Sequence, residues 1–273
     1  KTYEFHLDPL APRRSRSNLR QVTRNPGPLG GDQTSITESY TYQTGFGGCS
    51  CGTNFVTSHV DARGNVTQHG YDGRGNRLHT QHRIPSVVEN WEYNAFGQLT
   101  AHVLPDNGGG SRRRDTYAYY GPADGIQNGH LRLETRDSAG FSLATTYVYD
   151  AAGNVVRKID GRGNDTLFFR NALDQVVRQT SREVSPGSGI RYGRVFYYDA
   201  NDRLVRVDIE NRDEQGVLQP NAYFTRTYDY DILDRVVRET AEVDPARSIV
   251  TEIAYDANRN PALLRYGMAT NGA

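Results

Sequence analysis

A four-residue pattern, Asp or Asn followed three residues later by Gly or Asp, recurs along most of this chain. The first side chain of such a pattern can accept a hydrogen bond from the backbone two residues on. The fourth residue takes the left-handed conformation that Gly, Asn and Asp tolerate. Turns of this kind reverse a β-strand. The turn residues predicted in this way are Asp61, Gly64, Asp72, Gly75, Asn94, Gly97, Asp150, Gly153, Asp160, Gly163, Asn171, Asp199 and Asp231.

Short segments rich in Tyr, Val, Thr and Phe separate these turns. Turns near residues 150, 160 and 171 leave about six or seven residues between them, which is a usual strand length. No sustained apolar stripe with a period of 3.6 residues is found, so we expect very little helix. The sequence therefore predicts an all-β fold of tandem hairpins in a curved or spiralling antiparallel sheet.

A second regularity joins aromatic residues to arginines across several of these turns. Counted from the first turn residue, position minus three is aromatic and position plus seven is Arg. We expect each pair to face one another as an aromatic–arginine ladder, unless Arg merely occupies the exposed positions of a half-exposed strand. The pairs are Tyr147 with Arg157, Phe168 with Arg178, Phe196 with Arg206, and Tyr228 with Arg238.

The repeated turn, often preceded by Tyr, resembles the RHS or YD repeats. The residues that carry this resemblance are Tyr71-Asp72, Tyr149-Asp150, Tyr198-Asp199, Tyr230-Asp231 and Tyr255-Asp256, with Gly129-His130-Leu131 before a further copy. In that family the repeats wind a long β-sheet into a hollow shell. Its members include cocoon components of bacterial toxin complexes, polymorphic toxins, wall-associated proteins and teneurins. The resemblance implies a secreted or cell-surface bacterial protein whose partners are further repeats or copies of itself.

Not every feature of the family is found. The DPxGL-type cleavage motif that ends such arrays is missing, because Asp8-Pro9-Leu10-Ala11 lacks the Gly and lies at the wrong end, so no self-cleavage is transferred. We expect a partial repeat and a Gly/Pro loop in residues 1–39, the repeat array in 40–265 and a tail in 266–273, as in a segment cut from a longer shell.

The overall composition argues against several classes of protein. Lys plus Arg and Asp plus Glu are both 32, so nucleic-acid binding is not expected. No apolar run is long enough to span a membrane, and no signal peptide is visible. The 18 Tyr and 9 Phe supply the aromatic surface that a disordered chain would lack.

Few residues suggest chemistry. Cys49 and Cys51 lie in a Gly-rich stretch and could hold zinc together with His59 or His69, although a pair of small residues in a tight loop is the plainer interpretation. No cofactor is otherwise expected, and Asp61, Asp72 and Asp150 are explained as turn formers.

We therefore expect a non-catalytic segment of an RHS-type shell or extracellular scaffold, which encloses or displays a partner polypeptide such as a toxin. The alternative is an adhesin module whose Tyr and Arg face binds a cell-surface glycan or a protein. A metal-dependent enzyme that uses Cys49 and Cys51 is the third possibility.

Overall fold

The chain folds almost entirely as β-strands, as the sequence predicted. The computed structural model describes residues 1–6, 17–27, 34–43, 54–183 and 187–270. These residues form twenty strands and one 3-10 helix, η2 (Pro122–Gln127). The strand pairings with assigned registers are all antiparallel. The tandem hairpins expected from the repeated turns are therefore confirmed.

The chain divides into two units. Unit 1 comprises Lys1–Ala118 and Leu133–Ala144, and unit 2 comprises Tyr119–Arg132 and Thr145–Ala273. The strands of unit 1 are β1 (Thr2–Phe5), β2 (Leu19–Arg24), β3 (Ile36–Tyr42), β4 (Val56–Val60), β5 (Val66–Tyr71), β6 (Arg77–Gln81), β7 (Val88–Tyr93), β8 (Leu99–Asp106) and most of β9 (Arg112–Tyr119). Three strands have residues in both units: β9, whose last residue lies in unit 2, β10 (Leu131–Arg136) and β11 (Leu143–Tyr149).

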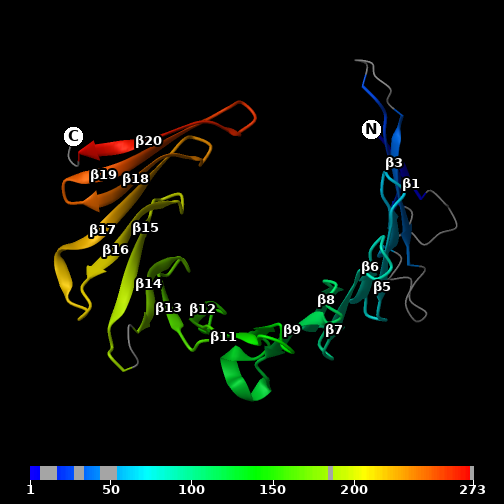
Figure 1. The fold of residues 1–273 in the computed structure, drawn as a ribbon, viewed down its shortest axis with the longest axis horizontal. Helices are drawn as coiled ribbons and strands as arrows, with labels where there is room; N and C mark the ends of the chain where they lie inside the picture. Colours follow the sequence, from blue (N-terminus) through cyan, green and yellow to red (C-terminus); the bar gives the residue numbers. More distant parts are fainter. Residues whose placement is uncertain (7–16, 28–33, 44–53, 184–186, 271–273) are drawn as a thin grey trace. The chain divides into compact units, whose positions relative to one another are not determined.

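Unit 2 continues the same pattern with longer strands. Figure 1 shows the strands from β14 onward side by side in chain order. They are β12 (Val155–Ile159), β13 (Asp165–Arg170), β14 (Val176–Glu183), β15 (Arg191–Tyr198), β16 (Leu204–Arg212), β17 (Leu218–Tyr230), β18 (Val236–Asp244), β19 (Arg247–Tyr255) and β20 (Pro261–Thr270).

Several hairpins carry a register shift immediately before the turn, whereas β4–β5 and β12–β13 keep an unbroken register. On β11, for example, Tyr149 pairs with Val155 but Val148 pairs with Arg157, so one residue of β12 is left without an opposite partner. The same shift occurs in the β13–β14, β15–β16 and β17–β18 hairpins. A bulge of this kind moves every later side chain to the other face.

Little apolar surface is buried. Among the described residues, the buried hydrophobic side chains are Val22, Ala101 and Val207, and no large side chain is fully buried. Both faces of the strands are thus largely accessible. Hydrophobic burial, which usually dominates folding, is small here. The stability of the array must rest to an unusual degree on the contacts between neighbouring hairpins.

Candidate functional site

The predicted turns all close in one way. In each, the backbone N–H of the fourth residue donates to the carbonyl of the first, as Gly64 does to Asp61 and Gly153 does to Asp150. The fourth residue has a positive φ whether it is Gly or Asp, with 78° at Gly64 and 60° at Asp174. The same bond closes the turns that begin at residues 61, 72, 94, 150, 160, 171, 199, 213, 231 and 256.

Two turns differ from their sequence interpretation. The turn at 256–259 ends in Arg, where the repeated pattern has Gly or Asp, yet Arg259 donates to the Asp256 carbonyl with a φ of 69°, so an Arg occupies the left-handed position. The stretch from residue 137 has the expected spacing but another geometry, because the positive φ falls on Asp137 (53°) and Ser142 (50°) and not on Gly140. Spacing alone did not distinguish these cases.

The side chain of a fifth residue completes most of these turns, and the sequence analysis missed it; the turn at Asp213, with Val217 in fifth place, is an exception. Asp72 Oδ1 accepts hydrogen bonds from the backbone N–H groups of Arg74 and Asn76, while Asn76 Nδ2 donates to Asp72 Oδ2 at 2.8 Å. Where the first residue is Asn, the fifth is Gln, as in the bond from Asn171 Nδ2 to Gln175 Oε1 at 2.6 Å. This matching of Asp with a donor and Asn with an acceptor was visible in the sequence.

Alternate turns lie at the same edge of the sheet, because successive strands run in opposite directions. In unit 2 we call one end the tyrosine edge, which carries the turns that begin at residues 150, 171, 199, 231 and 256. The opposite edge carries the turns that begin at 160 and 213. The similar turns at 150 and 160 therefore lie at the two ends of β12.

Neighbouring turns of the tyrosine edge bond to each other. The fifth residue of one turn donates to the fourth residue of the next: Asn154 Nδ2 to Asp174 Oδ1, Gln175 Nε2 to Asp202 Oδ1, and Arg203 Nη1 to Asp234 Oδ1, each at 2.9 Å. A left-handed conformation is costly for a residue other than Gly. The hydrogen bond that each of these Asp side chains accepts from the preceding turn offsets that cost, and it explains why Asp stands where Gly would fit more easily.

Where a tyrosine ends the strand before a turn, it often links its hairpin to an earlier strand. Its hydroxyl donates to the first backbone carbonyl of that strand, so Tyr230 Oη lies 2.7 Å from the oxygen of Leu204 on β16, and burial raises the pKa of Tyr230. Arg203 lies over the Tyr230 ring with its Cζ 5.0 Å from the centroid. The same hydroxyl bond recurs from Tyr42 to Leu19, Tyr71 to Val56, Tyr149 to Leu131, Tyr198 to Val176 and Tyr255 to Val236.

The aromatic–arginine ladder differs from its prediction by one residue. The bulge places Arg157 opposite Val148 and not Tyr147, whose opposite residue is Lys158. Likewise, Phe168 pairs with Gln179, Phe196 with Val207 and Tyr228 with Glu239, while Arg178, Arg206 and Arg238 stand opposite Phe169, Tyr197 and Asp229. Of these arginines, Arg206 lies over an aromatic ring, that of Tyr197, at 5.1 Å. The predicted pairing is therefore wrong because the bulge was not foreseen.

Most of these arginines instead neutralise carboxylates that the strands bury. Arg206 binds Asp208 through two hydrogen bonds of 2.7 and 2.8 Å, and Asp208 is only 2% exposed. Arg178 and Arg212 both pair with Glu210. Burial acts to raise the pKa of Glu210, but these cations and the Gly193 N–H hold that pKa below its ordinary value. The charged side chains therefore serve the sheet.

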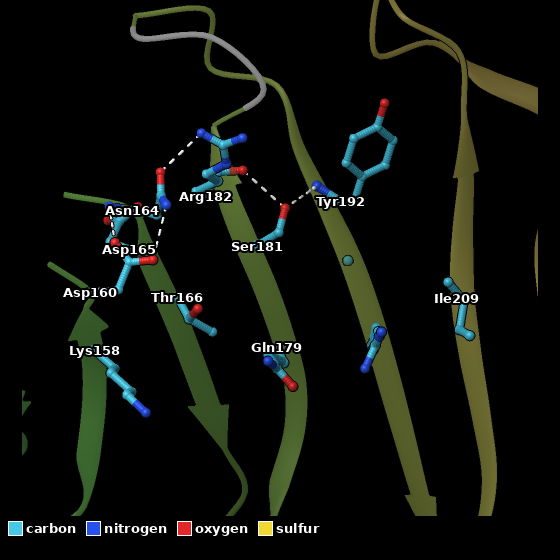
Figure 2. Close-up of a pocket in the computed structure, with 12 residues that line it drawn as sticks. Lys158, Asp160, Asn164, Asp165, Thr166, Gln179, Ser181, Arg182, Tyr192 and Ile209 are labelled. Carbon is cyan, nitrogen blue, oxygen red and sulfur yellow. Dashed lines mark hydrogen bonds between the residues drawn. The ribbon is translucent and has the colours of Figure 1, made fainter. Parts of the chain in front are cut away.

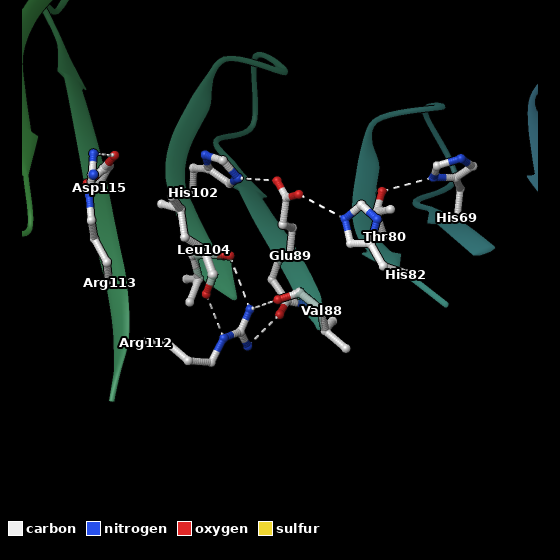
Figure 3. Close-up of polar contacts among 12 residues, drawn as sticks. His69, Thr80, His82, Val88, Glu89, His102, Leu104, Arg112, Arg113 and Asp115 are labelled. Atoms are coloured by element: carbon white, nitrogen blue, oxygen red, sulfur yellow. Dashed lines mark hydrogen bonds and ion pairs between the residues drawn. The ribbon is translucent and has the colours of Figure 1, made fainter. Parts of the chain in front are cut away.

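Histidines and a carboxylate form a second polar cluster, in unit 1 (Figure 3). Glu89 accepts a hydrogen bond from His82 Nε2 at 3.0 Å and from His102 Nε2 at 2.9 Å, and the His102 ring stacks on Trp91. Burial acts to raise the pKa of Glu89, but the two histidines hold it below its ordinary value. Across the part of the chain that the structure describes, no group of three or more His, Cys, Asp or Glu is arranged to hold a metal ion.

Cys49 and Cys51 lie outside the described residues, so their state stays a prediction. Their proposed companions are engaged elsewhere. His69 Nδ1 lies 2.9 Å from Thr80 Oγ1, and burial, together with the Arg77 cation, lowers the pKa of His69. The His59 ring stacks on Tyr40 with 4.7 Å between centroids.

An open groove of about 560 Å³ lies across β12 to β16 of unit 2 (Figure 2). Lys158, Gln179 and Tyr192 line it together with Ser181, whose hydroxyl accepts a hydrogen bond from the Tyr192 N–H. Asp160 lies at its rim but is held by Asn164 in the turn. The groove offers polar contacts without an evident nucleophile and base pair. No described helix is long and apolar enough to cross a membrane.

The chain was also compared with known proteins. It matches no protein-family model and none of the curated proteins. Among solved structures it is similar to TcdB2-TccC3-Cdc42, with 14% identity over 93% of this chain and a TM-score of 0.46. It is also similar to TcdB2-TccC3 without its hypervariable C-terminal region, with 13% identity over 96% of this chain and a TM-score of 0.48. The chain spans 16% of the length of each of these chains.

Proposed function

We propose that this chain is a non-catalytic wall segment of an RHS-type repeat shell, which acts outside the cell and encloses a partner polypeptide such as a toxin. The tyrosine edge is the observation that carries the proposal. Its Tyr, Asp, Asn, Gln and Arg side chains are used to bond one hairpin to the next. A chain whose polar side chains join successive hairpins in this way is suited to form an extended wall.

The tyrosines of the Tyr-Asp pairs that resemble YD repeats form part of these bonds, and the aspartates of the same pairs hold the turns closed. In unit 2, Tyr198, Tyr230 and Tyr255 each reach the strand that follows the preceding turn of the tyrosine edge. A repeat whose signature residues join neighbouring units can be lengthened by adding units, as in other repeat proteins. This supports further repeats as the natural partners of the chain.

The test is a protection experiment on the native polypeptide that carries this chain. It is digested with a protease before and after the repeats are unfolded, and the surviving fragments are identified by intact mass. Enclosure predicts that a segment outside the repeats survives only while the repeats stay folded. Digestion of every such segment while the repeats resist cleavage would overturn enclosure.

One observation favours a second function, a surface-binding module. Large aromatic side chains are exposed on the strands of unit 2, with Phe169 47%, Tyr197 43% and Tyr266 80% exposed. Exposed aromatic rows suit protein or glycan contacts. Binding of the isolated chain to a glycan array, lost when Tyr197 is changed to Ala, would support this function; an array without signal would count against it.

A further inference from the structure

A hollow lined by four arginines lies at the opposite edge of unit 2. It has a volume of about 430 Å³ and is bounded by the turn at 160–163 and by the ends of β14 and β15. Its guanidinium groups belong to Arg157, Arg162, Arg182 and Arg191. None of the contacts along the tyrosine edge uses these side chains, and the single buried carboxylate Asp165 pairs with only two of them, Arg157 and Arg191.

Hydrogen bonds hold three of the arginines in place. Asp165, whose side chain is 10% exposed, accepts Arg157 Nε at 2.9 Å and pairs with Arg191 Nη1 at 2.8 Å. Arg191 Nη1 also donates to the Ser181 carbonyl. Figure 2 shows Arg182, whose Nη1 donates to Asn164 Oδ1 at 2.9 Å. A ligand would therefore meet donors whose positions are already fixed, which lowers the entropy lost on binding.

These contacts leave donors free. Arg157 uses only Nε on Asp165, so its two terminal nitrogens have no partner among the described residues. The Arg162 side chain makes no hydrogen bond or ion pair within the same residues. Free guanidinium edges that converge on one hollow match the oxygens of a tetrahedral anion, which arginine binds through pairs of parallel hydrogen bonds.

The charge balance of the hollow also favours an anion. Its four guanidinium cations face two carboxylates, Asp165 and Glu183. Hydrogen bonds from Arg191 and then from Arg157 lower the pKa of Asp165 below its ordinary value, although burial opposes this. Asp165 therefore stays ionised and orients its arginines at neutral pH. Glu183 lies 3.9 Å from Arg191 Nη2. An excess of two positive charges remains.

We propose that this hollow binds a doubly charged tetrahedral oxyanion, namely a phosphate or sulfate group, either free or as the ester of a larger ligand. Apolar ligands are disfavoured because the lining consists of Arg, Asp, Asn, Glu and Gly. The proposal does not depend on enclosure of a polypeptide. It concerns a site in unit 2 that the isolated chain can be tested for directly.

The test is calorimetric titration of the chain with inorganic phosphate and, separately, with inorganic sulfate, at pH 7.5 and constant ionic strength. The double variant Arg162→Ala/Arg182→Ala removes two cations without touching the pairs of Asp165. The matched control is Arg63→Ala, since Arg63 holds the same third position in the turn at Asp61 as Arg162 does in the turn at Asp160.

We expect saturable binding of at least one oxyanion, weakened at least tenfold in the double variant and unchanged in the control. Binding of phosphate alone would assign a phosphate group, and binding of sulfate alone a sulfate group. The proposal is overturned if neither anion binds, or if the double variant binds as tightly as the original chain and the control. Circular dichroism of the double variant checks that the strands are retained, and Arg162→Ala alone, at an exposed turn position, repeats the measurement if they are not.

Discussion

Removal of a single hydroxyl from the tyrosine edge should weaken the array measurably. Tyr230→Phe deletes the group that donates to the Leu204 carbonyl at 2.7 Å, and it leaves the ring and its contact with Arg203 in place. Strand β17 keeps its register with β16 and β18, because those pairings use backbone groups. The variant therefore isolates one link between neighbouring hairpins.

The size of the effect follows from the bond and from its surroundings. A neutral hydrogen bond contributes about 1 kcal/mol to stability, and a buried carbonyl left without a partner costs somewhat more. Leu204 and Tyr230 are only half-buried, so water can reach the vacated carbonyl and the loss of stability should be about 1 kcal/mol. For a cooperative unit the size of unit 2, this loss lowers Tm by about 3 °C.

Calorimetry of the chain and of the variant measures this shift. The matched control is Tyr223→Phe, which removes a hydroxyl from the same strand, where the tyrosine is 37% exposed and makes no described hydrogen bond. The control should leave Tm within about 1 °C of the original value, as surface substitutions usually do. Equal shifts for the two variants would refute the reasoning.

Three further outcomes are expected from denaturant unfolding. Arg206→Ala leaves the buried carboxylate of Asp208 without its two guanidinium bonds and should lower the free energy of unfolding by about 2 kcal/mol. Arg206→Lys should restore part of this loss. An Arg206→Ala variant as stable as the original chain would contradict the role of the ion pair. Gly216→Ala should destabilise the chain more than Gly163→Ala. Both positions have a φ of 80°, but only at Gly216 would the added methyl meet a neighbouring side chain, that of Ile190 at 2.5 Å. Equal losses of stability would show that backbone strain at the turn alone decides. The pKa of Asp165 is lowered in the folded chain, so its carboxylate stabilises the fold above the unfolded value of 3.8, and this stability is lost as the pH falls below that value. Asp165→Asn should therefore lose stability less steeply between pH 4 and pH 2. Parallel plots of stability against pH for the two chains would count against this.

The turns were predictable because their chemistry is local. Asp72 and Gly75 meet the requirements of the turn within four residues, and Asn76 shows that even the fifth position had a readable signal. The register was harder to foresee. One extra residue beside the turn at Asp150 separates Tyr147 from Arg157, and no side chain in the sequence announces that bulge.

Contacts between distant residues were also out of reach of the sequence analysis. Asp174, Asp202 and Asp234 looked like substitutes for Gly, but each accepts a bond from a turn 20 to 31 residues away. The arginine hollow of unit 2 likewise depends on which strand ends meet at one edge. Such placements follow from the pairing of strands, and the sequence shows the pairing only through the turns.

Hydrogen exchange read by mass spectrometry tests the central claim, that contacts along the tyrosine edge hold the hairpins together. The triple variant Tyr198→Phe/Tyr230→Phe/Tyr255→Phe removes three successive links, and Tyr223→Phe serves as the control. Our account predicts faster exchange throughout β14 to β19 in the triple variant, because the burial that could otherwise hold these strands is small. Exchange that stays at the level of the original chain would contradict it and would show that the strand ladder alone carries the array.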